Sequence, residues 1–166
     1  RTLTLPEIAM LYEAIARETR HPDPMLLFNY FPLHDRIREV AQDHFRNGKY
    51  VAAVFEATKA LNAKIQECSG VFDKNEVELV QATMRQTPSN LRIRFNDALS
   101  RDSGKSEQSG LALIFEGVFR AFRNPKGHEL EDHPLVKITA IEALEQLIVI
   151  SYLMRRLETA YTGQVS

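Results

Sequence analysis

The chain has 166 residues and a formal net charge of −1, from 21 basic and 22 acidic side chains. This length suits one globular domain that buries a sizeable core without a disulfide or metal to hold it together. The single cysteine, Cys68, excludes an intramolecular disulfide framework and favours a reducing compartment, so we expect a cytoplasmic protein. The balanced charge excludes nucleic-acid binding through a general excess of basic residues. Any nucleic-acid binding would have to come from a local basic patch.

The longest largely apolar stretch, from Leu147 to Met154, covers eight residues. A membrane-spanning helix needs about 20, so we expect no membrane partner. The chain begins at Arg1 rather than at a methionine and shows no signal-peptide pattern. We therefore expect a piece of a longer protein or a cropped chain.

Helical periodicity dominates the sequence, so the predicted fold class is all-α. A capping box from Thr4 to Glu7 starts the first helix, and another from Asp73 to Glu76 starts a short one. Gly48 and Gly70 are expected to end the helices before them. The predicted helices cover about residues 5–19, 33–45, 49–67, 73–84, 111–123 and 135–159.

The pattern changes between residues 87 and 110. Leu91, Ile93 and Phe95 alternate with polar residues, a period of two that predicts a short strand or hairpin near residues 90–96. The small polar residues from Ser103 to Gly110 predict a mobile loop.

We expect one compact helical bundle in two parts. Residues 1–48 form an N-terminal helical segment that packs on the core, and residues 49–161 form the core domain. The last helix is apolar nearly all round from Leu147 to Met154. This predicts burial on two sides, either in the core or in a dimer interface.

The densest charge imbalance lies between the last two predicted helices. Arg120, Arg123 and Lys126 place three positive charges together before the first acid, Glu129. Acidic residues then follow as far as His133. The charges are therefore unevenly placed here, although their total over the chain is close to zero. Binding of RNA here would be local and sensitive to salt.

The same segment holds the residues best suited to chemistry. Pro125 and Gly127 predict a kink or short loop that lets Arg123 and His128 converge in a concavity. Arginine offers phosphate a planar fork of donors, and histidine exchanges a proton near neutral pH. Asn124 would orient a hydroxyl or a phosphate oxygen. The alternative interpretation is an ordinary helix end in which the histidine satisfies a backbone carbonyl.

Arg123 and His128 match the Arg-x4-to-6-His signature of the HEPN superfamily, which comprises all-helical nucleotide- and RNA-binding domains common in prokaryotic defence. The chain also resembles the Ymh-type hypothetical-protein branch of that superfamily over about residues 49–157, roughly two thirds of its length. The stretches that carry this resemblance are residues 50–61, 110–117, 123–128 and 142–157.

The resemblance implies a HEPN-like helical bundle and a metal-independent endoribonuclease that needs no cofactor. In the family mechanism, the ribose 2′-OH attacks the adjacent phosphorus and leaves a 2′,3′-cyclic phosphate and a 5′-OH. His128 would be the general base or acid, Arg123 would stabilise charge on the phosphorane oxygens, and Asn124 would position one of these groups. Such domains usually act as homodimers in phage defence or as toxins, under a regulatory protein or antitoxin.

Four further residues are candidates for binding the RNA substrate; they are Arg120, Lys126, Glu56 and Lys59. A solvated helix face is the competing interpretation of Glu56 and Lys59. The family resemblance also allows a non-catalytic module that binds a nucleotide or a partner, or an oligomerisation domain of a longer defence protein. Some HEPN toxins carry a modified tyrosine two residues after the histidine, where this chain has Leu130.

The remaining candidates have simpler interpretations. His128 and His133 are five residues apart and Pro134 follows, so they do not share a helix face and we expect no metal site. His34 and His44 are expected to be surface or partly buried residues. Cys68 is expected to be a small apolar filler.

Overall fold

The computed structural model describes residues 23–123 and 137–162, together with positions 4, 6, 7, 9, 10, 13 and 14. It divides into two units, Arg1–Pro32 and Leu33–Ser166. The described residues are mostly helical and contain one two-stranded sheet, which confirms the predicted all-α class with a short strand.

The first unit begins with the predicted capping box. The backbone N–H and hydroxyl of Thr4 both donate to the Glu7 carboxylate at 2.8 Å, and these bonds lower the pKa of Glu7. Helix α2, Pro24–Tyr30, lies outside the predicted helices. A proline fits the first position of a helix, and here the Asp23 side chain caps the N-terminus before it.

Two antiparallel helices open the second unit at the predicted places. Helix α3 spans Asp35–Arg46 and helix α4 spans Tyr50–Ser69. Gly48 lies in the turn between them and Gly70 ends α4, both with a φ of +70°. Glycine adopts this left-handed backbone without a steric penalty, and for this reason the sequence predicted both helix ends.

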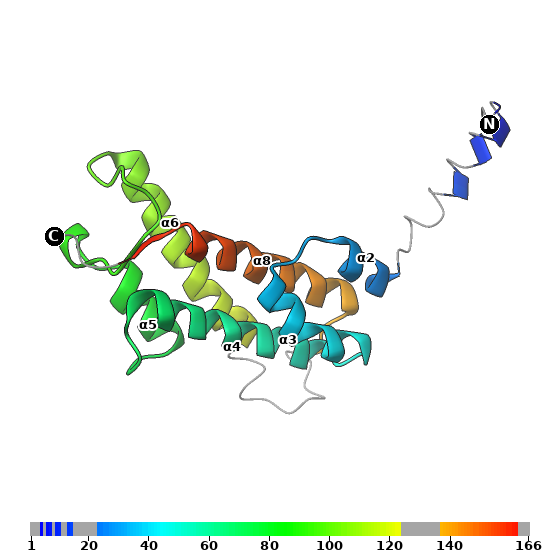
Figure 1. Cartoon of the computed structure of the whole chain (residues 1–166), viewed down its shortest axis with the longest axis horizontal. Helices are drawn as coiled ribbons and strands as arrows, with labels where there is room; N and C mark the ends of the chain where they lie inside the picture. The colour runs from blue at the N-terminus through cyan, green and yellow to red at the C-terminus, as the bar shows by residue number, and fades with distance from the viewer. Residues whose placement is uncertain are drawn as a thin grey trace. The chain divides into compact units, whose positions relative to one another are not determined.

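Helix α4 is the centre of the second unit. It packs against α3, against α8 (Ala140–Glu158) and against the π-helical turn η2 (Phe119–Arg123). Figure 1 shows α8 running alongside α4. The apolar stripe of α4 is completely buried; it comprises Ala53, Val54, Ala57, Leu61 and Ile65.

Helix α8 is mostly buried between residues 147 and 154, although Tyr152 is exposed, and the core of the unit accounts for this burial because both α3 and α4 contact the helix. A capping box starts it, in which the Thr139 backbone N–H and hydroxyl donate to Glu142 and lower the pKa of that carboxyl. The buried residues between 147 and 154 are Leu147, Ile150, Ser151, Leu153 and Met154.

The short helix α5 spans Glu76–Met84, and the predicted capping box at Asp73 is wrong. The N-cap residue is Asn75, whose side chain makes no capping bond. A contact from α4 replaces the local cap, since the Asn62 side-chain oxygen accepts the Glu76 backbone N–H at 2.7 Å. A contact between distant residues therefore decides where α5 begins.

The predicted strand near residue 93 is confirmed as β1, Ile93–Arg94. It pairs antiparallel with β2, Tyr161–Thr162, so the partner comes from the far end of the chain. The Arg94 guanidinium lies 5.4 Å from the centre of the Tyr161 ring, which adds a cation–π contact to this short pairing.

The mobile loop predicted from Ser103 to Gly110 is wrong, because α6 spans Asp102–Val118. Gly104 and Gln108 lie on the buried side of this helix, whereas Ser103, Lys105, Ser106, Glu107 and Ser109 are exposed. Gln108 is 5% exposed and accepts the Phe95 N–H at 2.9 Å. Its amide donates to the carbonyls of Met84 and Ile93 at 3.0 and 3.1 Å. The composition of this stretch does not predict that a polar side chain there is buried and bonds backbone groups from other segments.

Replacing Gly104 with alanine is expected to destabilise the fold by about 1–3 kcal/mol, because the new Cβ would collide with the Ala98 backbone carbonyl. Gly110 lies on the same helix, and a Cβ there would meet no atom within 4 Å. Gly110→Ala should therefore stabilise the helix by about 1 kcal/mol. Urea unfolding of both variants is the test, and equal effects of the two substitutions would contradict the close packing.

Candidate functional site

Arg123 lies where three elements meet. It is the last residue of η2, which continues α6. Its guanidinium carbon lies 5.2 Å from the centre of the Phe55 ring on α4. Its NH1 atom lies 2.9 Å from Oε1 of Glu76 on α5. The side chains of Arg123 and Glu76 are 27% and 24% exposed, so the pair is partly desolvated and its geometry is restricted by the ring beneath it.

The backbone of Glu76 is strained. It has a φ of +52°, in the left-handed region that side chains other than glycine seldom adopt. Such a conformation costs roughly 1–3 kcal/mol and persists where surrounding contacts enforce it. Asn62 supplies one such contact by accepting the Glu76 backbone N–H. The result is a carboxylate held at a fixed place beside Arg123.

Phe55 brings two of the predicted cations together. Lys59 Nζ lies 6.0 Å from the centre of the same ring that Arg123 contacts. Lys59 also forms an exposed ion pair with Glu56 at 3.0 Å. The predicted residues Lys59 and Arg123 are thus neighbours, and Glu56 enters the arrangement through Lys59.

Sequence reasoning missed Phe55, although a signal was available. Phe55 is a large aromatic residue outside the apolar stripe of α4, and it is half-buried rather than buried. Glu76 carried no comparable signal, since an acid in the first turn of a helix is ordinary.

Arg120 points to a different acid. Its NH2 atom lies 3.8 Å from Oε2 of Glu116, and its own side chain is 60% exposed. Asn124, Lys126 and His128 lie outside the described residues, so their convergence with Arg123 stays a prediction.

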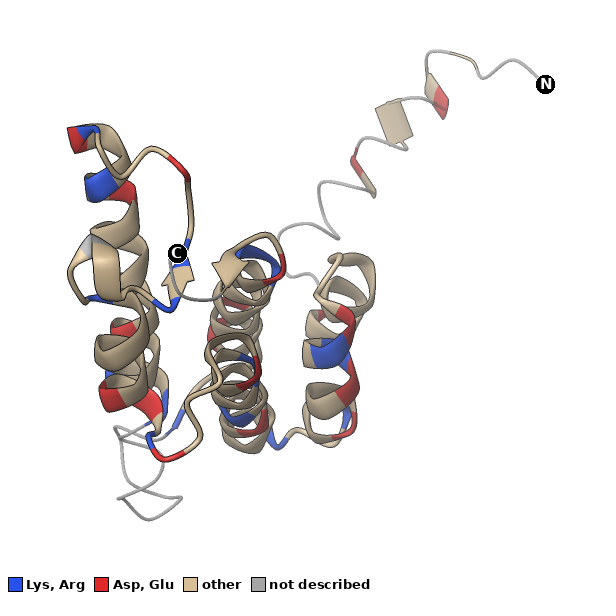
Figure 2. Ribbon diagram, turned by 60° about the vertical axis from the view of Figure 1, so that its left-hand side comes forward, with Lys and Arg blue, Asp and Glu red and all other residues tan. Residues whose placement is uncertain are grey.

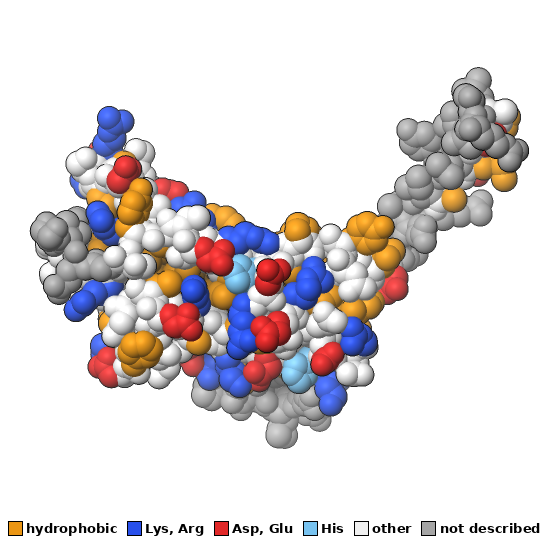
Figure 3. Space-filling view, in the orientation of Figure 1, with side chains coloured by type: hydrophobic (Ala, Val, Ile, Leu, Met, Phe, Trp, Pro, Cys, Tyr) orange, Lys and Arg blue, Asp and Glu red, His pale blue; other side chains and the backbone are white. Residues whose placement is uncertain are grey.

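The charge around the site is local rather than broad. Basic and acidic residues are interspersed along the described helices in Figure 2, and their side chains are mixed on the face that Figure 3 shows. This mixture agrees with the net charge of −1. Any recognition of a phosphate group therefore depends on individual arginine and lysine placements.

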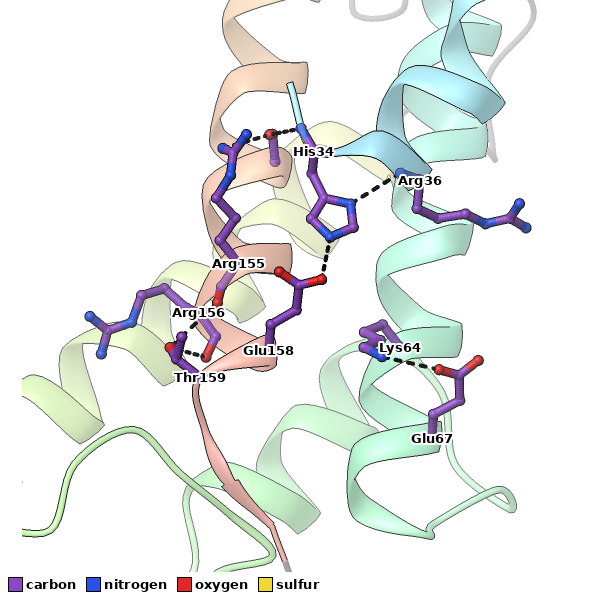
Figure 4. A network of polar contacts seen from close by, with 9 residues as sticks. His34, Arg36, Lys64, Glu67, Arg155, Arg156, Glu158 and Thr159 are labelled. Atoms are coloured by element: carbon purple, nitrogen blue, oxygen red, sulfur yellow. Dashed lines mark hydrogen bonds and ion pairs between the residues drawn. The ribbon is translucent and has the colours of Figure 1, made fainter. Parts of the chain in front are cut away.

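His34 has a structural role at the start of α3. Its Nδ1 accepts the Arg36 backbone N–H at 3.1 Å, which caps the helix. Its Nε2 donates to Glu158 at 2.9 Å, and its backbone N–H donates to the Ser151 hydroxyl at 2.6 Å. Figure 4 shows the ring between Arg36 at the start of α3 and Glu158 on α8. With a side chain 13% exposed, His34 is partly buried as predicted.

The other lesser candidates also have structural interpretations. His44 is partly exposed on α3. Cys68 is half-buried in α4, and this burial raises the pKa of its thiol, which fits a filler rather than a nucleophile. The described residues contain no cluster of His, Cys, Asp and Glu that could hold a metal ion. The pair His128 and His133 lies outside them.

Among the described residues, every helix is too short or too polar to span a lipid bilayer.

A family model described as "Protein of unknown function (Hypoth_ymh)" matches residues 32–157, about three quarters of the chain. The match includes α4, α5, α6 and η2, the elements that place Arg123 and its neighbours. No curated protein and no solved structure matches the chain. The chain therefore belongs to the Hypoth_Ymh family.

Proposed function

We propose that this protein is a HEPN-superfamily endoribonuclease that cuts RNA without a metal ion. The ribose 2′-OH attacks the adjacent phosphorus, and the bond from phosphorus to the 5′ oxygen breaks. The products are a 2′,3′-cyclic phosphate and a 5′-OH. The proton lost by the 2′-OH is balanced by the proton that the leaving oxygen gains.

The observation that carries this proposal is the fixed placement of the Arg123 guanidinium. Phe55 lies against the guanidinium and Glu76 holds one end of its fork. A guanidinium has five N–H donors in one plane, more than a single carboxylate accepts. Donors fixed in advance stabilise developing charge better than mobile ones, because they need no reorganisation during the reaction.

The other roles follow from the resemblance to the HEPN superfamily. His128 moves the proton to or from the reacting oxygens, and Asn124 orients one of them. Arg120, Lys126 and Lys59 bind the RNA backbone, and Glu56 holds Lys59 through the ion pair described above.

The proposal includes a homodimer in which two copies of the motif share one cleft. Because α8 is buried within its own unit, the homodimer rests on the family resemblance. So do the cytoplasmic setting, the defence or toxin role and the antitoxin or other regulatory protein.

One observation favours a second candidate, a non-catalytic HEPN module that binds a nucleotide or a partner protein. Glu76 neutralises much of the Arg123 charge, which would weaken its attraction for a phosphorane. A binding module would tolerate this neutralisation, whereas a nuclease must overcome it when the substrate arrives.

Incubation of the purified protein with single-stranded and structured RNA in EDTA separates the two candidates. The nuclease predicts cleavage that survives chelation and leaves 2′,3′-cyclic phosphate ends, which mass spectrometry of the fragments detects. A folded protein that binds RNA or nucleotides and leaves the RNA intact would contradict the nuclease and support the binding module.

A further inference from the structure

The buried carboxylate of Glu116 forms ion pairs with two arginines, Arg85 and Arg120. The Glu116 side chain on α6 is 7% exposed, and its Oε1 lies 2.7 Å from Arg85 NH1. Its Oε2 accepts from Gln81 at 3.3 Å and pairs with Arg120 at 3.8 Å. A buried charge is costly unless such partners compensate it. Glu116 therefore holds both arginines at one place on α6.

Arg85 extends the row of cations that begins at Arg123. Glu76 is the first residue of α5, and Arg85 directly follows its last residue. The rise of a helix over these nine residues is about 14 Å, so the two ion pairs lie at opposite ends of α5. The first pair includes Arg123, the last residue of η2, and the second includes Glu116, near the end of α6. We call Arg85, Arg120 and Arg123 the arginine seam.

Of the two acids that pair with the arginine seam, Glu116 lies inside and its two arginines lie outside. Glu116 is almost completely buried, whereas the side chains of Arg85 and Arg120 are 42% and 60% exposed. Three arginines are paired with two glutamates, Glu76 and Glu116, which leaves an excess of positive charge at the surface. Arginine presents a planar fork that matches the oxygens of a phosphate.

We propose that Glu116 is a positioning residue, which holds Arg85 and Arg120 to bind backbone phosphates of the RNA strand that is cut at Arg123. This inference rests on the proposed function for the identity of the strand. It assigns RNA contacts to Arg85, which lies far from the HEPN signature in the sequence.

An electrostatic role and a positioning role of Glu116 predict opposite effects of its substitution on RNA affinity. Glu116→Gln removes one negative charge, so a purely electrostatic effect would strengthen RNA binding. If Glu116 positions the arginines, the same substitution weakens binding although the protein becomes more positive. This opposition separates a positioning role from a general effect of charge.

The test uses a short single-stranded RNA with 2′-O-methyl sugars, which lacks the attacking hydroxyl and stays intact. Fluorescence anisotropy gives Kd from 50 to 200 mM KCl. Arg85→Gln is expected to raise Kd about fivefold at low salt and to reduce the slope of log K against log salt by about 0.7, the value for one phosphate of a single strand. Glu116→Gln is expected to raise Kd by a similar factor.

Two matched controls remove the same charges elsewhere. Arg46 and Glu39 are exposed residues of α3, paired with Asp43 and Arg36 respectively. Arg46→Gln and Glu39→Gln should change Kd less than twofold. Circular dichroism checks that each variant is folded, and Glu116→Asp should restore part of the affinity lost in Glu116→Gln.

The inference is overturned if folded Glu116→Gln binds as tightly as the wild type or tighter, or if Arg85→Gln behaves like Arg46→Gln. Wild-type protein that does not bind the RNA also overturns it. If Glu116→Gln fails to fold, the comparison of Arg85→Gln with Arg46→Gln decides alone. Wild type that binds but never cuts natural RNA contradicts the nuclease and leaves the seam intact, whereas cleavage with unaffected variants contradicts only the seam.

Discussion

Replacing His128 with alanine is expected to slow RNA cleavage by about 10²–10⁴-fold, the contribution of a well-placed general acid or base. The imidazole is the only group in the signature that exchanges a proton near neutral pH. Binding of RNA should change little, because the backbone contacts are assigned to arginines and lysines. Single-turnover cleavage in EDTA gives the rate, and anisotropy with 2′-O-methyl RNA gives the affinity.

His133 is the matched control for this experiment. It lies five residues further along the same segment and is not part of the signature. His133→Ala should keep the cleavage rate within about twofold of the wild type, since a substitution away from the chemistry costs no transition-state stabilisation. Equal losses in both variants would point to folding of the segment rather than to proton transfer, and full activity of His128→Ala would refute its role.

Replacing Arg123 with lysine is expected to lower the cleavage rate by about 10²–10³-fold, as for the loss of a preorganised donor to an oxyanion. Lysine keeps the positive charge and can still pair with Glu76. It lacks the planar fork that Phe55 and Glu76 hold in place. The measurement is the single-turnover rate beside the thermal unfolding temperature.

Arg46→Lys provides the comparison, because Arg46 is an exposed arginine on α3 whose ion pair is with Asp43. It should leave both the rate and the stability unchanged. If Arg123→Lys remains folded and cuts at the wild-type rate, positive charge alone suffices and the fixed guanidinium is not the basis of activity.

Much of the helical framework was predictable from local patterns. The stripe of α4 and the glycines at 48 and 70 specify α3 and α4 without reference to the rest of the chain. The errors arose where distant residues decide local structure. Asn62 replaces the expected cap of α5, and Gln108 anchors a largely polar helix by bonding the backbone near β1.

The candidate site divides in the same way. Arg120 and Arg123 were found because their charges lie close together in the sequence. Glu116 lies four residues before Arg120, so the helical spacing in the sequence contains that pair. Phe55 and Glu76, the partners of Arg123, come from other places in the chain, and their positions depend on how α4, α5 and η2 pack.

The backbone of Glu76 implies a trade-off between stability and function. Glycine would relieve the left-handed conformation at the first residue of α5 and would make the fold more stable. It would also remove the carboxylate that holds Arg123. Stabilising substitutions often reduce activity when they relax a strained site. On the proposed function, a thermostable design of this protein that placed glycine at this position would gain thermal resistance and lose its control over the arginine.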